Sequence, residues 1–345
     1  MDALQKIDNP PLDNPPLDFT YGTGNWDGKN ATYVASNKVR EGVHYVELGQ
    51  YPCTYVGDDM NATLADAYYG GTLRNGMTAT GKSYTSNSST TGDTYTPKTS
   101  AEYLYNGQKY VRVSILSAST DYPFSTGTNN GASGSIRWFK VEPIKWLIGN
   151  WDALPKSINP YGTGTEDSVL KLVAAEVITA SVPFYHIYTD VNCALWSDSV
   201  ARTFLNETFY NEAFDAAARG KIASVAVPNN TTAGTVNTVG DGVTTTDKIF
   251  LPSYYEVFNA SGTYNKIFDT NAKRQGVLTD FAIANYAYMD STSNTSSNYR
   301  MGSWWLRSAY SLFGVRYVYC DGADDYTFSD SPNIGLRPAC ALALS

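Results

Sequence analysis

The alternation of apolar and polar side chains predicts a strand-rich chain. Over residues 43–48 and again over residues 110–116, β-branched and aromatic side chains alternate with polar ones, as in half-buried strands. Residues 137–148 form a longer run of this kind, and we expect a bulge or bend at Pro143 because proline cannot donate a hydrogen bond to a central ladder. Residues 170–178 are mostly apolar and predict a buried strand.

The period of the pattern changes near residue 200. Apolar residues between positions 200 and 209 recur at near-helical spacing, and Ser197 or Ser199 is available as the N-cap. This segment predicts the principal amphipathic helix, packed on the sheet.

Shorter elements follow in the second half of the chain. Residues 248–251 predict a short strand. Ser253 and Glu256 then have the S-x-x-E spacing of a capping box, which predicts a short helix over residues 254–258. Residues 278–286 are a third helical candidate.

Segments rich in Gly, Ser, Thr and Asn predict loops. We expect long surface loops over residues 70–100 and linker loops over residues 229–246. A tandem of paired prolines over residues 8–19 fixes the backbone in extended form, as a tether, a strap across the domain, or a disordered leader. The expected organisation is an extended Pro-rich leader, residues 1–35, followed by a single domain, residues 36–345.

Charge and hydropathy exclude two classes of partner. With 345 residues and 42% hydrophobic residues, the chain is able to bury a sizeable core. The net charge of -8 and the pI near 4.8 argue against nucleic-acid binding, which depends on clustered Lys and Arg. The chain has neither a visible signal peptide nor an apolar run of about eighteen residues, so we expect no membrane span.

Cysteines and histidines give little support for metal or catalytic chemistry. The four cysteines are far apart, without a C-x-x-C pair, and free buried thiols are favoured over disulfides. They are Cys53, Cys193, Cys320 and Cys340. His44 and His186 are the only histidines, and we interpret both as packed or surface residues. We therefore expect no cofactor and no metal.

One motif match is a coincidence on our interpretation. Residues 76–83, GMTATGKS, satisfy the P-loop pattern G-x-x-x-x-G-K-[ST]. Phosphate binding by this motif needs a hydrophobic strand before the loop and a helix after it. The flanking sequences AYYGGTLRN and YTSNSSTTGD fit neither requirement.

The C-terminal segment has an unusual composition. WWLR and IGLRPA, at its two ends, predict buried scaffold, and the part between them is a turn-rich run of Tyr, Asp, Ser and Gly. Residues 308–335 contain no Lys, Glu, Gln, Met or Trp, where composition alone predicts about three. These are the five amino acids that cannot be reached when the adenines of an AAC or AAT codon are randomised.

This pattern resembles the variable region of a diversity-generating retroelement target protein with a C-type lectin fold. The rest of the chain is similar to a bacterial domain of unknown function through four segments in a fixed order. They are YVELGQYPC at residues 45–53, KVEPIKW at 140–146, WWLRS at 304–308 and GLRPA at 335–339. The chain departs from that pattern at Cys53, where the family usually has Gln.

The resemblance implies a fold class and a function. The fold would be α+β and C-type lectin-like, a variant like that of the formylglycine-generating enzymes, with long loop insertions. The protein would be a non-catalytic ligand-binding protein, with an unknown protein or cell-surface ligand as its partner, at the cell surface or on a virion. An unvaried surface or structural domain of the same family is the alternative.

Two further uses of this fold are disfavoured. Calcium-dependent sugar binding needs EPN or QPD with WND, and only the fragment EPI at Glu142 is present. A formylglycine-generating oxidase needs reactive paired cysteines, and the sequence around Cys320 and Cys340 does not match that chemistry. We therefore expect a protein that is not an enzyme.

The resemblance also separates a frame from a variable surface. Val318, Gly322 and the closing GLRPA match frame positions, and Arg307 and Arg337 are expected to be partly buried and to bind loop carbonyls or carboxylates. The candidate ligand-binding positions, within a variable region of about 308–335, are all reachable from AAC or AAT. They are Tyr310, Ser311, Leu312, Phe313, Val315, Tyr317, Tyr319, Ala323, Asp324, Asp325, Tyr326, Phe328, Asp330, Ser331, Pro332 and Asn333.

Overall fold

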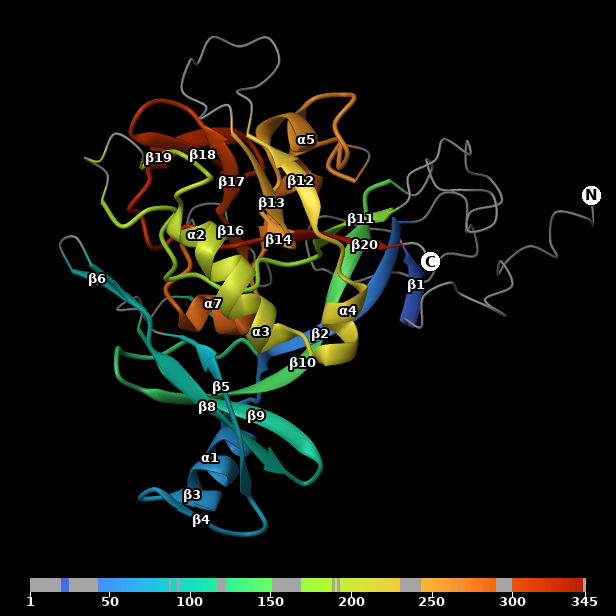
Figure 1. Cartoon of the computed structure of the whole chain (residues 1–345). Coiled ribbons are helices and arrows are strands. Elements are labelled where there is room, and N and C mark those ends of the chain that lie inside the picture. The colour runs from blue at the N-terminus through green and yellow to red at the C-terminus, as the bar shows by residue number, and fades with distance from the viewer. Residues whose placement is uncertain are drawn as a thin grey trace, which may run out of the picture.

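The computed structural model is an α+β protein with antiparallel sheets (Figure 1). It describes residues 20–24, 43–86, 88–91, 94–116, 122–150, 169–187, 190, 193–229, 243–265, 267–289 and 300–343. The Pro-rich tandem and most of the expected leader lie outside these residues. Within the leader, β1 (Thr20–Gly24) pairs with β2.

A nine-stranded antiparallel sheet organises the described part of the chain. Its path runs β14 (Ile249–Phe250), β20 (Ala339–Ala343), β11 (Val169–Ala174), β10 (Ile136–Ile148), β9 (Gln108–Ser114), β8 (Thr99–Tyr105) and β5 (Thr78–Thr85), and β2 (Val43–Tyr55) joins β10 to β1. The strands predicted at residues 43–48, 110–116, 137–148 and 248–251 are thereby confirmed in this sheet, and the one predicted at 170–178 is present as far as Ala174.

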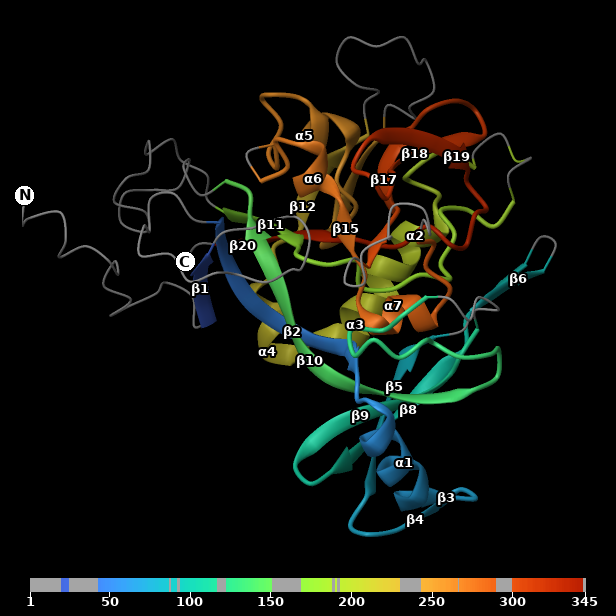
Figure 2. The ribbon, with the colours of Figure 1, turned by 180° about the vertical axis from the view of Figure 1, so that it is seen from behind.

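The two longest strands, β2 and β10, lie side by side and bend together (Figures 1 and 2). Their register shifts between Phe139 and Val141 and again between Pro143 and Lys145. The second shift confirms the irregularity expected at Pro143, whose missing N–H interrupts the ladder. The buried Trp146 side chain of β10 adds a hydrogen bond to β2, because its indole N–H donates to the Leu48 carbonyl oxygen at 2.9 Å.

The expectation of loops over residues 70–100 was wrong. This segment contains β5, the start of β8 and three short strands, which are β4 (Thr72–Leu73), β6 (Ser89–Thr91) and β7 (Thr94–Thr96). β4 pairs with β3 (Tyr68–Tyr69), which lies just before the segment. The many Thr and Tyr side chains favour strands wherever a partner strand is available, so pairing outweighs the loop-like composition. Residues 78–83 of the P-loop pattern lie in β5, which confirms that the match is coincidental.

The principal helix is confirmed, with a change of winding at its centre. α2 (Val200–Thr203), the π-helical η3 (Phe204–Phe209) and α3 (Tyr210–Ala213) run without a break. Ser199 is the N-cap and accepts a hydrogen bond from the Arg202 amide. Asn206 fastens the helix to the sheet, since its amide donates to the Ile249 carbonyl oxygen at 2.8 Å and accepts from the Lys248 amide at 2.8 Å.

Short helices complete the described elements. α5 (Tyr254–Phe258) begins at the predicted capping box, with both reciprocal hydrogen bonds present between Ser253 and Glu256. α7 (Asp280–Ala284) lies within the third helical candidate and packs on β2. The remaining helices are α1 (Asp58–Ala67), α4 (Ala216–Lys221) and α6 (Asn271–Arg274).

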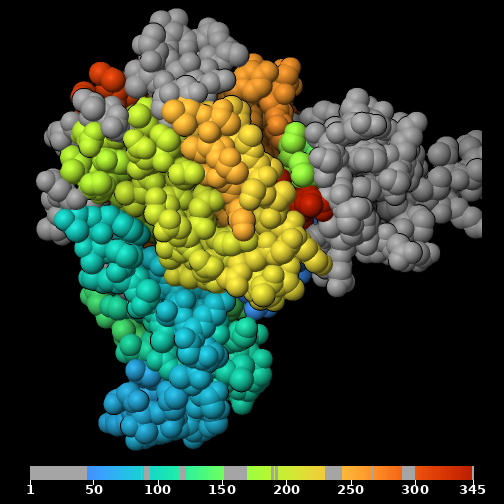
Figure 3. All heavy atoms as spheres, in the orientation of Figure 1, coloured from blue at the N-terminus to red at the C-terminus, as the bar shows by residue number. Residues whose placement is uncertain are grey.

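Two hydrophobic clusters lie at different places in the fold. The large one extends from the main sheet to the C-terminal strands. The small one surrounds Trp138 beneath α1 and contains Leu64, Met77 and Tyr103. Figure 3 shows the α1 end as a protruding lobe, and Figures 1 and 2 place the C-terminal sheet β17–β18–β19 at the opposite end.

The C-terminal sheet is one of several small sheets outside the main one. It consists of β17 (Trp304–Ala309), β18 (Gly314–Val318) and β19 (Asp324–Phe328). Near it lie the pairs β12 (Val225–Pro228) with β13 (Thr244–Asp247) and β15 (Gly276–Val277) with β16 (Met301–Gly302). β13 corrects part of the linker loop expected over residues 229–246, and residues 230–242 of that linker lie outside the described residues.

Candidate binding surface

A buried frame holds both ends of the C-terminal segment. Trp304 and Trp305 have no exposed surface, and Leu336 is 1% exposed. The Trp305 amide donates to the Gly335 carbonyl oxygen at 3.0 Å, and the Gly335 amide donates to the Ser303 carbonyl oxygen at 2.9 Å. The predicted core of these residues is therefore present, and it brings the two ends of the variable region together.

The two frame arginines are more deeply buried than expected and bind as predicted. Arg307 is 4% exposed and donates from Nη1 to the Leu251 carbonyl oxygen at 2.7 Å and to Glu256 at 2.5 Å. Arg337 is fully buried and donates to the carbonyl oxygens of Ala174 and Ala175 at 3.0 and 2.8 Å. Each guanidinium thus links the C-terminal segment to distant parts of the chain.

The two predicted frame positions inside the segment have structural reasons for their identity. Val318 is fully buried and pairs with Trp304. Gly322 has φ +85°, and an added Cβ would lie 1.8 Å from the Asn271 carbonyl oxygen. A side chain at position 322 would collide with backbone, so glycine is required there.

The alternation of strand side chains divides the variable region between two faces. In β18–β19 the cross-strand pairs Arg316–Tyr326 and Gly314–Phe328 share one face, and Tyr317–Asp325 lies on the other. Tyr326 and Phe328 are 50% and 56% exposed, so the first face is open to solvent. The expectation that all sixteen candidate side chains point outward is therefore wrong for Val315 and Tyr317, although Asp325 on the second face is exposed.

Val315 and Tyr317 are the two candidate ligand-binding positions that the structure corrects. Val315 is fully buried and cannot contact a ligand at the surface, and Tyr317 is 8% exposed. The Tyr317 ring packs edge-on against Trp305, with centroids 6.1 Å apart, and its hydroxyl donates to Asp325 at 2.9 Å. Both side chains occupy inward positions of β18, which makes them part of the frame.

The outward side of the C-terminal sheet carries an ordered aromatic group. The rings of Tyr310 and Tyr326 stack with centroids 3.6 Å apart. The Arg316 guanidinium lies 4.4 Å from the centroid of Tyr254 and 5.1 Å from that of Tyr310, and it pairs with Asp324. Cation–π contacts on both sides hold this arginine in place.

Arg316 and Tyr254 are site residues that the sequence reasoning missed. The strand period was the available signal for Arg316, since alternation places this side chain on the face opposite to Val315 and Tyr317. Tyr254 belongs to α5, far away in the sequence, and only the tertiary structure brings it to this surface.

Exposed apolar side chains are concentrated in the same region. Leu312 is 50% exposed and Phe313 is 37% exposed, at the turn between β17 and β18. With Tyr326 and Phe328 they make up four of the nine large exposed hydrophobic side chains of the described residues. We call Tyr254, Tyr310, Leu312, Phe313, Arg316, Tyr326 and Phe328 the aromatic face.

The other candidates lie around the aromatic face or near the frame. Asp325 is exposed, and the others are half-buried: Ser311, Tyr319, Ala323, Asp324, Asp330, Ser331, Pro332 and Asn333. Pro332 and Asn333 are held through their backbone, because their carbonyl oxygens accept from the amides of Ser181 and Tyr288. Burial raises the pKa of the Asp324 carboxyl, and this effect outweighs the attraction of Arg316.

The structure places the cysteines and histidines singled out in the sequence. None of the four cysteines forms a disulfide, as favoured, and Cys193, Cys320 and Cys340 are buried. Burial raises the pKa of the Cys340 thiol, which disfavours the thiolate needed for reactive cysteine chemistry. No group of three or more His, Cys, Asp or Glu able to hold a metal ion occurs among the described residues. His186 stacks on Tyr185, while the His44 side chain lies outside the described atoms.

The comparisons with known proteins give one match. The family described as "Domain of unknown function (DUF6273)" matches residues 171–344, which include the C-terminal sheet and the WWLRS and GLRPA segments. None of the curated proteins and none of the solved structures matches the chain. In the part of the chain that the structure describes, the helices are too short or too polar to cross a membrane.

Proposed function

The chain belongs to the DUF6273 family, a domain of unknown function, and we propose that it is a non-catalytic ligand-binding protein that contacts its partner through the aromatic face. The observation that carries this proposal is the separation of two groups of side chains in one short segment. Trp304, Trp305 and Val315 are fully buried, whereas Tyr326 and Phe328 are about half exposed. Contiguous exposed apolar side chains on a soluble protein mark interaction sites.

The side chains of the aromatic face suit recognition of a protein. Tyr and Phe give large contact areas with few rotatable bonds, and neighbouring Asp and Ser side chains give adaptable hydrogen bonds, a combination typical of antibody paratopes. The stack of Tyr310 on Tyr326 and the contacts of Arg316 order this surface before a partner arrives. Preorganisation lowers the conformational entropy lost on binding. The expected partner is a protein or another cell-surface ligand.

A finer proposal concerns the origin of the surface. We propose a C-type lectin-like fold of the formylglycine-generating-enzyme-like variant, whose C-terminal surface is diversified by adenine-directed mutagenesis. The absence of Lys, Glu, Gln, Met and Trp from residues 308–335 supports it. The frame also supports it, because exposed side chains that contribute little to stability can be replaced freely. A cell-surface or virion location would suit such a protein.

The alternative is an unvaried surface domain of the same family. The DNA around the gene separates the two. Diversification requires a nearby near-copy of the last hundred or so bases, differing only at positions of adenine, together with a reverse transcriptase gene. A complete locus without these two elements would rule out the diversified form and leave the unvaried domain.

A further inference from the structure

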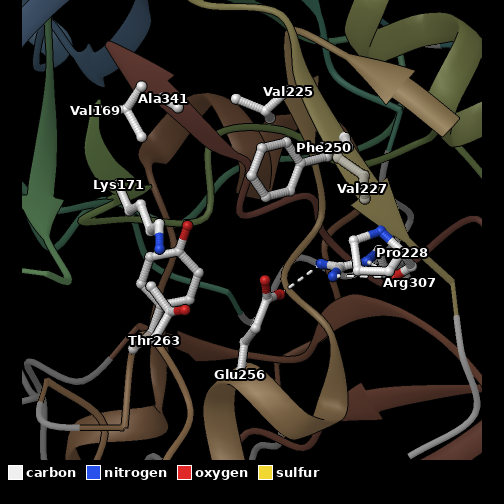
Figure 4. A pocket seen from close by; sticks show the side chains of 12 residues that line it. Val169, Lys171, Val225, Val227, Pro228, Phe250, Glu256, Thr263, Arg307 and Ala341 are labelled. Carbon is white, nitrogen blue, oxygen red and sulfur yellow. Dashed lines mark hydrogen bonds and ion pairs between the residues drawn. The ribbon is translucent and has the colours of Figure 1, made fainter. Parts of the chain in front are cut away.

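A pocket of about 180 Å³ opens at the end of the main sheet, separate from the aromatic face. β11 and β20 contribute Val169, Lys171 and Ala341 to it, and β12 and β14 contribute Val225, Val227 and Phe250. The remaining side includes the ion pair of Glu256 and Arg307 (Figure 4).

The polar end of the pocket is built around an ionised carboxylate. The Glu256 Oε2 atom accepts from the Ser253 amide at 2.7 Å and from Arg307 Nη1 at 2.5 Å. Both bonds end on the same oxygen, and the other oxygen of Glu256 points into the pocket (Figure 4). The Glu256 side chain is 21% exposed and lines the pocket, so its carboxylate is within reach of a ligand there.

Tyr264 also lines the pocket, and its hydroxyl is buried. This hydroxyl donates its proton to the Leu172 carbonyl oxygen at 3.2 Å. Arg307 is held by the Leu251 and Glu256 oxygens and neutralises the carboxylate charge. The polar end therefore favours a ligand group that donates hydrogen bonds.

The apolar end sets the size and character of the rest of the ligand. Val169, Val225, Val227, Phe250 and Ala341 lie together across the pocket from Glu256 (Figure 4). A dry cavity of about 150 Å³ holds a benzene molecule in a well-studied protein. A pocket of about 180 Å³ thus has room for one ring and a small polar substituent.

We propose that this pocket binds a small amphipathic molecule, with a ring-sized apolar body against Phe250 and the valines and a hydroxyl or amine that donates to Glu256. A carboxylate head has no proton to donate to Glu256, so it cannot form this hydrogen bond, although Lys171 also lines the pocket. The site does not depend on the aromatic face, so it stands or fails separately from the proposed function.

Four probes of one shape test the proposal on the full chain by titration calorimetry and by chemical-shift mapping. Benzyl alcohol and benzylamine carry donors, toluene carries no polar head, and benzoate carries an anion. We expect both donor probes to bind at least tenfold more tightly than toluene or benzoate, with shifts at Phe250 and Glu256. If benzyl alcohol binds more tightly than benzylamine, the polar group of the natural ligand is neutral. If benzylamine binds more tightly, that group is cationic.

A matched pair of variants locates the binding. Val225→Phe places a ring at the half-buried rim of the pocket and leaves the ion pair intact, and Thr246→Phe changes an exposed position on the neighbouring strand β13. Val225→Phe should weaken benzyl alcohol binding at least tenfold, and Thr246→Phe should not change it, with circular dichroism confirming that both fold. Equal binding of toluene or benzoate, absence of binding at millimolar probe, or full binding by Val225→Phe would overturn the proposal.

Discussion

The ring of Tyr310 lies parallel to the ring of Tyr326, with centroids 3.6 Å apart and 12° between their planes. Tyr310 follows the end of β17 and Tyr326 is in the edge strand β19, so the stack packs the residue after β17 against β19. Arg316, 5.1 Å from the Tyr310 centroid, extends this ordered group toward Tyr254. The aromatic face is therefore a structured surface, and its parts can be tested one at a time.

Removal of the Tyr310 hydroxyl should change the titration of Tyr326. The hydrogen bond with Tyr310 raises the pKa of the Tyr326 phenol. Tyr310→Phe should return that pKa toward the ordinary value of tyrosine, as followed by NMR of carbon-labelled tyrosine. Tyr69→Phe, at an exposed tyrosine outside the aromatic face, is the control and should have no effect. An unchanged Tyr326 pKa in Tyr310→Phe would show that the two hydroxyl groups do not interact in solution.

Gly322→Ala should destabilise the turn between β18 and β19. The residue has φ +85°, and its new Cβ would lie 1.8 Å from the Asn271 carbonyl oxygen, which is backbone and cannot rotate away. We expect a loss of about 1 to 3 kcal/mol or more in the free energy of unfolding, measured with urea. Ala323→Ser, at the next position, should change it by less than about 0.5 kcal/mol. Equal stability of the two variants would contradict the role given to Gly322.

Glu256 should stabilise the protein only when it is ionised. Burial favours its neutral form, but Arg307 and the Ser253 amide outweigh burial and lower the pKa of Glu256 below 4.5. A lowered pKa in the folded state means that the stabilisation is present above pH 4.5 and is lost as pH falls through the lower value.

Glu256→Gln leaves the buried Arg307 unpaired and should cost about 3 to 5 kcal/mol at neutral pH. The difference between wild type and variant should shrink as pH falls below 4.5. Urea unfolding across this pH range measures it, and a difference that stays constant with pH would contradict the ionised pair.

Glu212 should have the opposite effect on the pH dependence of stability to that of Glu256, because its pKa is raised in the folded state. Burial raises its pKa from 4.5 to about 7, although Thr85 and Tyr51 donate to the carboxylate and partly offset this effect. The folded state then binds the proton more tightly than the unfolded state. Its stabilisation is full below pH 4.5 and is lost as pH rises through about 7.

Between pH 4.5 and a pH above 7, the titration of Glu212 should lower the unfolding free energy of the wild type by about 3 kcal/mol. The Glu212→Gln variant should lack this decrease. Glu207→Gln, an exposed position on the same helix, should keep the wild-type slope. Identical slopes in the two variants would show that Glu212 titrates normally.

Local signals in the sequence predicted much of the frame. The capping box of Ser253 and Glu256 and the N-cap Ser199 depend on neighbours a few residues away, and both are present. The buried Trp304 and Trp305 follow from side-chain size and apolarity. These features were predictable because the short-range chemistry and the fold agree.

Features set by tertiary pairing were not predictable in the same way. The Thr-rich segment over residues 70–100 has a loop-like composition, but β5 finds a partner in β8 and becomes a strand. Codon reachability says nothing about the direction of a side chain, so it did not separate Val315 from exposed positions. The contact of Arg316 with Tyr254 joins elements from different parts of the chain.

The free energy of unfolding of one triple variant tests most directly whether the frame is indifferent to the exposed side chains. Leu312, Phe313 and Phe328 are replaced together by Ser, and Val315→Ala is the matched change inside the frame. Surface changes usually alter stability by less than about 0.5 kcal/mol each, whereas Val315→Ala should cost about 2 kcal/mol through lost burial and a cavity. We predict that the triple variant unfolds with a free energy within about 1 kcal/mol of wild type. A loss larger than that of Val315→Ala would contradict a display surface carried by an independent frame.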